Sequence, residues 1–86
     1  MPVISRFNVL RIEMYFLDHG EPHFHVRYGE YSAQFEIQSL ELTCGSLPGR
    51  AFQLAVEWAG LHQEELMQNW RLTQTGRPAI RIDPLI

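Results

Sequence analysis

The spacing of apolar residues changes once along this 86-residue chain, near the tripeptide Leu47-Pro48-Gly49. Before this point apolar residues recur at every second position, the period of β-strands. After it they recur every three or four positions, the period of α-helices. Strands followed by helices are typical of the α+β class. The sequence therefore predicts an antiparallel three- to four-stranded meander followed by helical segments packed on one face of the sheet.

The chain length favours one domain, because 86 residues can bury only one small core. We expect a single domain over residues 1–86. Its strand region covers about residues 3–45, its helical region covers about residues 48–75, and an extended tail covers residues 77–86.

Three segments of the strand region alternate apolar and polar residues: 10–16 (LRIEMYF), 23–28 (HFHVRY) and 31–38 (YSAQFEIQ). Only Gly29-Glu30 separates the last two, and glycine at the first central position suits a two-residue hairpin turn. A short further strand is expected within residues 40–46. The hairpin turn predicts these opposite pairs: Tyr28 and Tyr31, Val26 and Ala33, His25 and Gln34, Phe24 and Phe35, and His23 and Glu36.

The first segment can join this hairpin in two registers, because parity leaves Glu13 opposite either His25 or Arg27. The second register avoids placing Arg11 directly opposite Arg27, where like charges would repel. The sequence alone leaves both registers open. In either case the core face carries the same side chains, namely Leu10, Ile12, Met14 and Phe16.

The helical region carries signals for its start, a break and its end. Pro48 suits a first helical position, and Ser46 is available as a cap. Gly60 offers a breaking point in a span that would be long for one helix, so we expect a bend or short interruption near it. Gly76 followed by Pro78 is the usual exit pattern.

Three of the four histidines fall within the run DHGEPHFHVRY, residues 18–28. His23 and His25 share the strand face opposite the core, so their rings can converge above the sheet. Glu36 is expected opposite His23, and Asp18, His19 and Glu21 lie in the adjoining turn, where they could close the site. Two imidazoles and a carboxylate suit zinc, manganese, iron or nickel. The sequence thus predicts a divalent-metal site formed by His23, His25, Glu36 and His19.

Two other interpretations of the histidines stay open. They could simply be polar residues on the solvent face of an antiparallel sheet. The same face, which includes Tyr15 and Leu17, could also pack against another protein chain or a second copy of this one.

A catalytic interpretation assigns Glu13 or Asp18 as the general base that deprotonates a metal-bound water. The His-Phe-His strand resembles the metal pair of rolling-circle nucleases. Those enzymes carry a nucleophilic tyrosine on a helix, whereas the tyrosines here all lie in the strand region. A net charge of −3 and a pI near 5.7 disfavour nucleic acid as a direct ligand.

Cys44 is the single cysteine, so no intrachain disulfide can form and a cytoplasmic setting is favoured. We expect its side chain to be buried or half-buried. No apolar run is long enough for a membrane span, and no export signal is evident.

Several segments together resemble a known family of small bacterial proteins. They are MPVISRF, MYFLDHGEPHFHVRYGEY, LPGRA, EWAGLHQEELMQNW and IDPL, in this order over nearly the whole chain. By them the chain is identified as a member of the domain of unknown function 4160 family. The family pattern includes an aspartate-histidine turn and a proline-histidine-phenylalanine-histidine run, matched here at Asp18, His19 and residues 22–25. Gly20 and Glu21 fill a turn that is richer in proline among relatives.

The resemblance implies a partner more than a reaction. Members are often encoded beside a second small protein of the domain of unknown function 2442 family, in a layout similar to toxin–antitoxin pairs. We therefore expect a cytoplasmic protein-binding component of such a two-gene module. The resemblance transfers no catalytic role to any residue of this chain.

Overall fold

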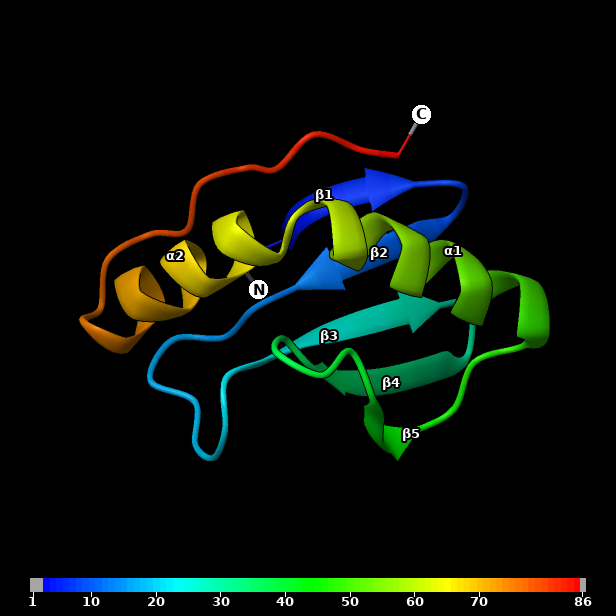
Figure 1. Ribbon diagram of the computed structural model, residues 1–86, viewed down its shortest axis with the longest axis horizontal. Helices are drawn as coiled ribbons and strands as arrows, with labels where there is room; N and C mark the ends of the chain where they lie inside the picture. The colour runs from blue at the N-terminus through cyan, green and yellow to red at the C-terminus, as the bar shows by residue number, and fades with distance from the viewer. Residues whose placement is uncertain (1–2, 86) are drawn as a thin grey trace.

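The computed structural model describes residues 3–85 and has a two-layer α+β architecture (Figure 1). Five antiparallel strands form one sheet in the order β1-β2-β3-β4-β5, and Figure 1 shows both helices on one face of it. The predicted class is confirmed, with a slightly higher strand count than predicted. The elements are β1 (Val3–Phe7), β2 (Leu10–Glu13), β3 (His23–Tyr28), β4 (Tyr31–Glu36), β5 (Leu42–Gly45), α1 (Gly49–Leu61) and α2 (Gln63–Gln74).

The central hairpin has the register predicted from its turn. β3 and β4 pair from Tyr28 opposite Tyr31 to His23 opposite Glu36. Gly29 has a φ of 58°, a backbone region that glycine enters without steric cost. The short strand expected within residues 40–46 is β5.

The register between β2 and β3 settles the alternative left open by the sequence. Glu13 lies opposite His25, and Arg11 lies directly opposite Arg27. The two like charges are tolerated because the Glu13 carboxylate accepts a hydrogen bond from the Nε of each arginine, at 2.7 Å from Arg11 and 3.3 Å from Arg27.

The first strand of the sheet, β1, forms a hairpin with β2 through Asn8 and Val9. Both turn residues have positive φ, 46° and 65°, as a type I′ turn requires. Valine is rarely found there because its branched side chain crowds the backbone. The strand region was expected to begin near residue 3, but no individual strand was predicted before residue 10, because this turn lacks the usual glycine.

The alternating pattern of residues 10–16 extends beyond the strand itself. β2 ends at Glu13, and the chain then leaves the sheet in a loop that continues to residue 22. Met14 is still fully buried, but Phe16 is 47% exposed. The prediction that Phe16 lies in the core was therefore wrong, because alternation predicts a face only while the chain stays paired.

Aromatic rings fill the core between the sheet and the helices. Trp58 of α1 is fully buried and packs against Phe7 and Phe24, with ring centroids 5.7 and 6.2 Å apart. Phe24 stacks on Phe35 at 5.6 Å. The Trp58 indole donates to the carbonyl of Asp83 at 2.8 Å, which ties the C-terminal tail to the core.

The helical region is interrupted near Gly60, as predicted, and the break lies at His62. His62 leaves helical geometry with a φ of −127°, so α1 ends at Leu61 and α2 begins at Gln63. The Gln63 side chain donates to the carbonyls of Ile37 and Gln38, which fixes the break against the turn after β4. These Gln63 hydrogen bonds explain why the helix breaks at His62, two residues after Gly60, the residue with the lowest helix propensity in this region.

The helix ends differ in how they are capped. Pro48 occupies the N-cap of α1 without a side-chain hydrogen bond, so the predicted cap by Ser46 was wrong. Ser46 instead continues the sheet edge, donating its N–H to the Ser32 carbonyl. The end of α2 follows the sequence prediction, because Gly76 has a φ of 78° and the Gly76 and Arg77 amides donate to Thr73 and Leu72.

The C-terminal segment is extended and docks on both layers, as its pattern predicted. Asn69 of α2 exchanges two hydrogen bonds with the backbone of Ile80, each 2.8 Å long. Ile82 is buried and its amide donates to the carbonyl of Ile4 at 2.7 Å. Figure 1 shows this segment passing α2 and then running beside β1.

Two further features bear on the sequence expectations. Cys44 is exposed on β5, so the expectation of a buried or half-buried cysteine was wrong. Among residues 3–85, no helix is both long and apolar enough to cross a membrane.

Candidate metal centre

The loop between β2 and β3, residues 14–22, is held in place by the C-terminal half of α2. The amide of Leu17 donates to the Thr73 carbonyl at 3.1 Å, and the Gln74 side chain donates to the Asp18 carbonyl at 3.0 Å. Leu17 itself has a φ of 52°, which turns the chain back toward β3. These contacts bring the Asp18 carboxylate over the start of β3.

Three side chains converge at that point. Oδ2 of Asp18 lies 2.8 Å from Nε2 of His23 and 3.2 Å from Nε2 of His25. The ligand-capable atoms of the three residues all lie within 4.8 Å of one another. Two donors of one ion at about 2.1 Å are themselves roughly 3 Å apart, so the spacing suits a shared metal ion. The arrangement is a two-histidine, one-carboxylate group.

The hydrogen bond at the other nitrogen of His23 defines what its Nε2 can do. Nδ1 lies 2.7 Å from the carbonyl oxygen of Glu21, which can only accept, so Nδ1 carries a proton. Nε2 then either carries a proton that it donates to Asp18 or, in the neutral ring, presents a lone pair to a cation held between the two atoms. Such a contact is favourable only with a proton or a cation between the two atoms. A backbone acceptor behind the ring is also how proteins orient histidine ligands of metals.

Aromatic neighbours fix the two imidazole rings. His23 packs against Trp70 of α2 with centroids 5.0 Å apart, and His25 packs against Tyr15 at 4.2 Å. The two imidazoles meet edge to face at 5.1 Å. His23 is only 4% exposed, so it is not the solvent-facing residue that strand alternation suggested. Its burial follows from contact with α2 and the loop, which strand alternation cannot foresee.

The electrostatics of the group favour an ionised Asp18. Partial burial alone would raise the pKa of this carboxyl, but hydrogen bonds from His25, the His19 amide and His23 outweigh it and lower the pKa below its ordinary value. The carboxylate is therefore available as an anionic ligand through the neutral pH range.

The predicted ligands Glu36 and His19 lie outside this group. Glu36 is opposite His23 in the sheet, but its Oε1 accepts from the Ser39 hydroxyl at 2.9 Å. His19 is exposed and contributes only its backbone N–H, which donates to Oδ1 of Asp18 at 2.9 Å. Asp18, considered from sequence as a general base and as one of the turn residues that could close the site, takes the position of the carboxylate ligand.

Glu13, the other sequence candidate for a general base, has no solvent exposure. Its carboxylate accepts from Arg11, from Arg27 and from the Tyr15 hydroxyl at 2.9 Å. Burial and the Glu13 hydrogen bond raise the pKa of Tyr15, while hydrogen bonds to Tyr15 and Glu13 raise the pKa of Arg27. With three donors on its two oxygens and no solvent exposure, Glu13 orders its neighbours and is not accessible to solvent water.

Tyr15 and Trp70, which position the imidazoles, were not recognised as site residues from sequence. Tyr15 lies two residues beyond Glu13, on the same face by parity, and that spacing was the available signal. Trp70 had no comparable signal, because its place beside His23 depends on how α2 crosses the sheet.

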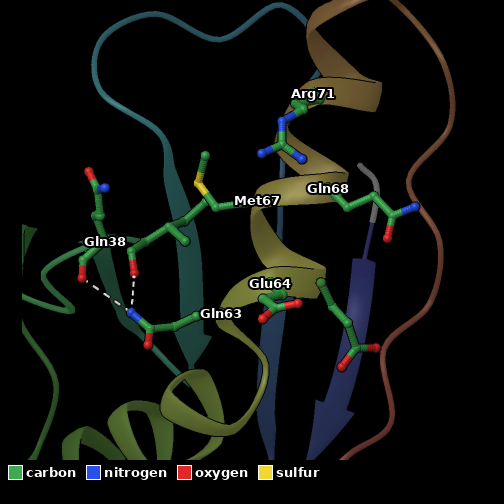
Figure 2. Close-up of a pocket in the computed structure, with 8 residues that line it drawn as sticks. Gln38, Gln63, Glu64, Met67, Gln68 and Arg71 are labelled. Atoms are coloured by element: carbon green, nitrogen blue, oxygen red, sulfur yellow. Dashed lines mark hydrogen bonds between the residues drawn. The ribbon is translucent and has the colours of Figure 1, made fainter.

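A cavity of about 620 Å³ lies elsewhere, between α2 and the turn after β4. Figure 2 shows Gln63 reaching the backbone of that turn, with Met67 and Arg71 along the α2 side. Its lining is mostly amides and scattered charges. Cavity size alone does not outweigh the convergence of ligand atoms at Asp18, His23 and His25.

Comparison with known proteins identifies the family. The sequence profile described as "Domain of unknown function (DUF4160)" matches residues 10–71, from β2 into α2. The chain belongs to this family. The match includes all three residues of the metal-capable group, and the family assigns no activity to them. No curated protein and no solved structure matches the chain significantly.

Proposed function

We propose that this protein of the DUF4160 family binds one divalent transition-metal ion through Asp18, His23 and His25. The observation that carries the proposal is the convergence of two Nε2 atoms on a single Asp18 oxygen, at 2.8 and 3.2 Å. Two imidazoles and one carboxylate form a donor set typical of zinc, manganese, iron or nickel and leave coordination positions open.

Metal titration of untagged, chelator-treated protein tests this proposal. Isothermal titration with Zn²⁺ and Mn²⁺ should give one saturable site, which Asp18→Asn and His25→Ala abolish. His62→Ala and Glu36→Gln are matched controls, because these side chains lie outside the group, and they should bind as the parent does. Unchanged binding in Asp18→Asn, with a native circular dichroism spectrum, would remove the proposal.

We further propose that the metal site belongs to a protein-binding surface in a cytoplasmic two-gene module of toxin–antitoxin type, whose partner is the small protein encoded nearby. Exposed apolar side chains flank the site and support this role. Phe16 is 47% exposed and Leu17 is 62% exposed, both immediately before Asp18. Large apolar groups beside fixed polar groups are common at protein interfaces.

Co-expression with the neighbouring small protein, followed by size-exclusion chromatography with light scattering, tests the partner. Leu17→Asn should abolish the complex, because it removes an exposed apolar side chain from the proposed interface. Asparagine is chosen because it tolerates the positive φ at this position, so that the backbone should keep its conformation. Leu61→Asn, at a residue 68% exposed on α1, is the matched control and should leave it intact. A second copy of this chain is the other outcome that the same measurement distinguishes. Monomeric protein with no partner bound would contradict the proposal.

A metal-dependent hydrolase or nuclease is the alternative function. It needs a general base within reach of a metal-bound water. Asp18 is committed to the two histidines and Glu13 to its three donors. These contacts favour binding over catalysis. Metal-dependent hydrolysis of a phosphodiester or ester probe, lost in Asp18→Asn, would reverse that preference.

A further inference from the structure

Three arginines form a row across three adjacent strands on the sheet face opposite the helices. Arg6 of β1 lies opposite Arg11 of β2, and Arg11 lies opposite Arg27 of β3. Strands lie about 4.8 Å apart, and like charges directly opposite each other are destabilising. The chain has seven cationic residues, so almost half of them share this row. A negatively charged group bound beside the row would relieve this repulsion.

Part of the compensation is built into the sheet. The fully buried Glu13 carboxylate accepts from Nε of Arg11 and from Nε of Arg27. A guanidinium has five N–H donors, and these bonds use one from each arginine. The side chains of Arg11 and Arg27 remain 40% and 43% exposed. Glu13 therefore orients both groups and leaves donors directed to solvent.

A cavity of about 320 Å³ opens at this row. All three arginines line it, together with Val9, Leu10 and Gly29, and no carboxylate is among its lining residues. The adjacent hairpin turns at Val9 and Gly29 form its rim. Three positive charges and the one negative charge of Glu13 leave a net charge of +2 at the site.

We propose that this pocket binds the phosphate group of a small phosphorylated molecule. A phosphate monoester carries a charge of about −1.5 to −2 at neutral pH, which matches the net charge of +2 that the three arginines and Glu13 give the site. Arginine binds phosphate through paired N–H donors, and groups already oriented by a buried carboxylate lose little freedom on binding. The net charge of −3 on the whole chain favours a small ligand over a nucleic acid polymer.

The phosphate pocket lies beside the metal centre but shares no residue with it. Arg27 and His25 are two positions apart on one face of β3, roughly 7 Å along the strand. The pocket includes neither Asp18 nor either histidine of the metal-capable group. The proposal therefore holds whether or not metal binds, and it can be tested in chelator-treated protein.

The test is a titration of chelator-treated protein with glycerol 3-phosphate, inorganic phosphate and acetate at constant ionic strength. Binding is measured from the NMR chemical shifts of the backbone amides. Glycerol 3-phosphate should bind one site more tightly than inorganic phosphate, shifting the amides near Val9 and Gly29, while acetate should bind at least about tenfold more weakly. Arg27→Gln should weaken binding by at least about tenfold, and Arg6→Gln by about fivefold. Arg77→Gln, at an exposed residue after α2, is the matched control and should have no effect.

Three results would overturn the proposal. One is no saturable binding up to about 10 mM of either phosphate. Another is equal binding by Arg6→Gln, Arg27→Gln and Arg77→Gln, which would mean an adventitious ion only. The third is a short oligonucleotide binding more tightly than glycerol 3-phosphate. Arg6 makes no hydrogen bond to Glu13, so Arg6→Gln stays informative even if Arg27→Gln fails to fold.

Discussion

Glu13 on β2 lies directly opposite His25 on β3, and Tyr15 joins the two residues. The Tyr15 hydroxyl donates to Glu13 at 2.9 Å while its ring packs on His25 with centroids 4.2 Å apart. The arginine row and the metal-capable group therefore meet through one buried carboxylate and one aromatic ring. Replacing Glu13 should therefore perturb both the arginine row and the metal-capable group.

Replacing Glu13 by glutamine should destabilise the fold by about 2 kcal/mol, because two opposed arginines lose their shared negative charge. The estimate lies below that for a fully buried pair because both arginines are partly exposed. Urea unfolding measures the change, and added NaCl should recover part of it by screening the repulsion. Glu57→Gln, at an exposed residue of α1, is the control. Equal stability of the two variants would contradict the structural role of Glu13.

Replacing Val9 by glycine should stabilise the protein by about 0.5–1 kcal/mol. A branched residue at a φ of 65° is strained by about 1–2 kcal/mol, and the extra freedom of glycine in the unfolded chain offsets part of the gain. Thermal unfolding measures the difference. Val9→Ala keeps a Cβ at the same φ and should gain much less. A lower melting temperature for Val9→Gly would show that the exposed valine side chain contributes stability of its own.

Replacing Gly45 by alanine should destabilise the protein by about 2–3 kcal/mol. Gly45 has a φ of 78°, and an added Cβ would overlap the carbonyl oxygen of Ser32 on the neighbouring strand. Gly60→Ala is the matched control, since a Cβ there meets only the Leu40 side chain at 3.8 Å within a helix. That variant should gain about 0.5–1 kcal/mol. Chemical denaturation of both variants measures the change in the free energy of unfolding, which should have opposite signs for the two glycine-to-alanine replacements.

Replacing Ser5 by alanine should stabilise the protein by about 1 kcal/mol. Ser5 is 1% exposed, and within the described part of the chain its hydroxyl has no hydrogen-bond partner. A buried polar group without a partner loses its hydrogen bonds to water, and no hydrogen bond within the protein replaces them. Differential scanning calorimetry gives the change in melting temperature. A clear loss of stability would indicate a water molecule bound at this hydroxyl.

The fold followed from sequence wherever local signals and pairing agreed. The Gly29-Glu30 turn set the β3–β4 register, and Gly76 ended α2. The β1–β2 hairpin was missed because a valine occupies a turn position that glycine usually fills. Arg11 opposite Arg27 could not be chosen from sequence, since the side chain that neutralises them, Glu13, was assigned no such role.

Less of the candidate site than of the fold could be predicted from the sequence. Strand alternation correctly puts His23 and His25 on one face, but it says nothing about the loop that carries Asp18 over them. That loop is held by long-range hydrogen bonds from Thr73 and Gln74. A cross-strand partner such as Glu36 can be counted from a register, whereas a loop ligand depends on the packing of α2.

Asp18, His23 and His25 are proposed to hold one metal ion. Anomalous diffraction from crystals of untagged protein soaked in Zn²⁺ or Mn²⁺ tests it most directly. We expect one strong peak about 2.0–2.3 Å from Nε2 of both histidines and from an Asp18 oxygen. No peak at this position, or a peak only at surface residues such as Glu64 and Glu65, would contradict it.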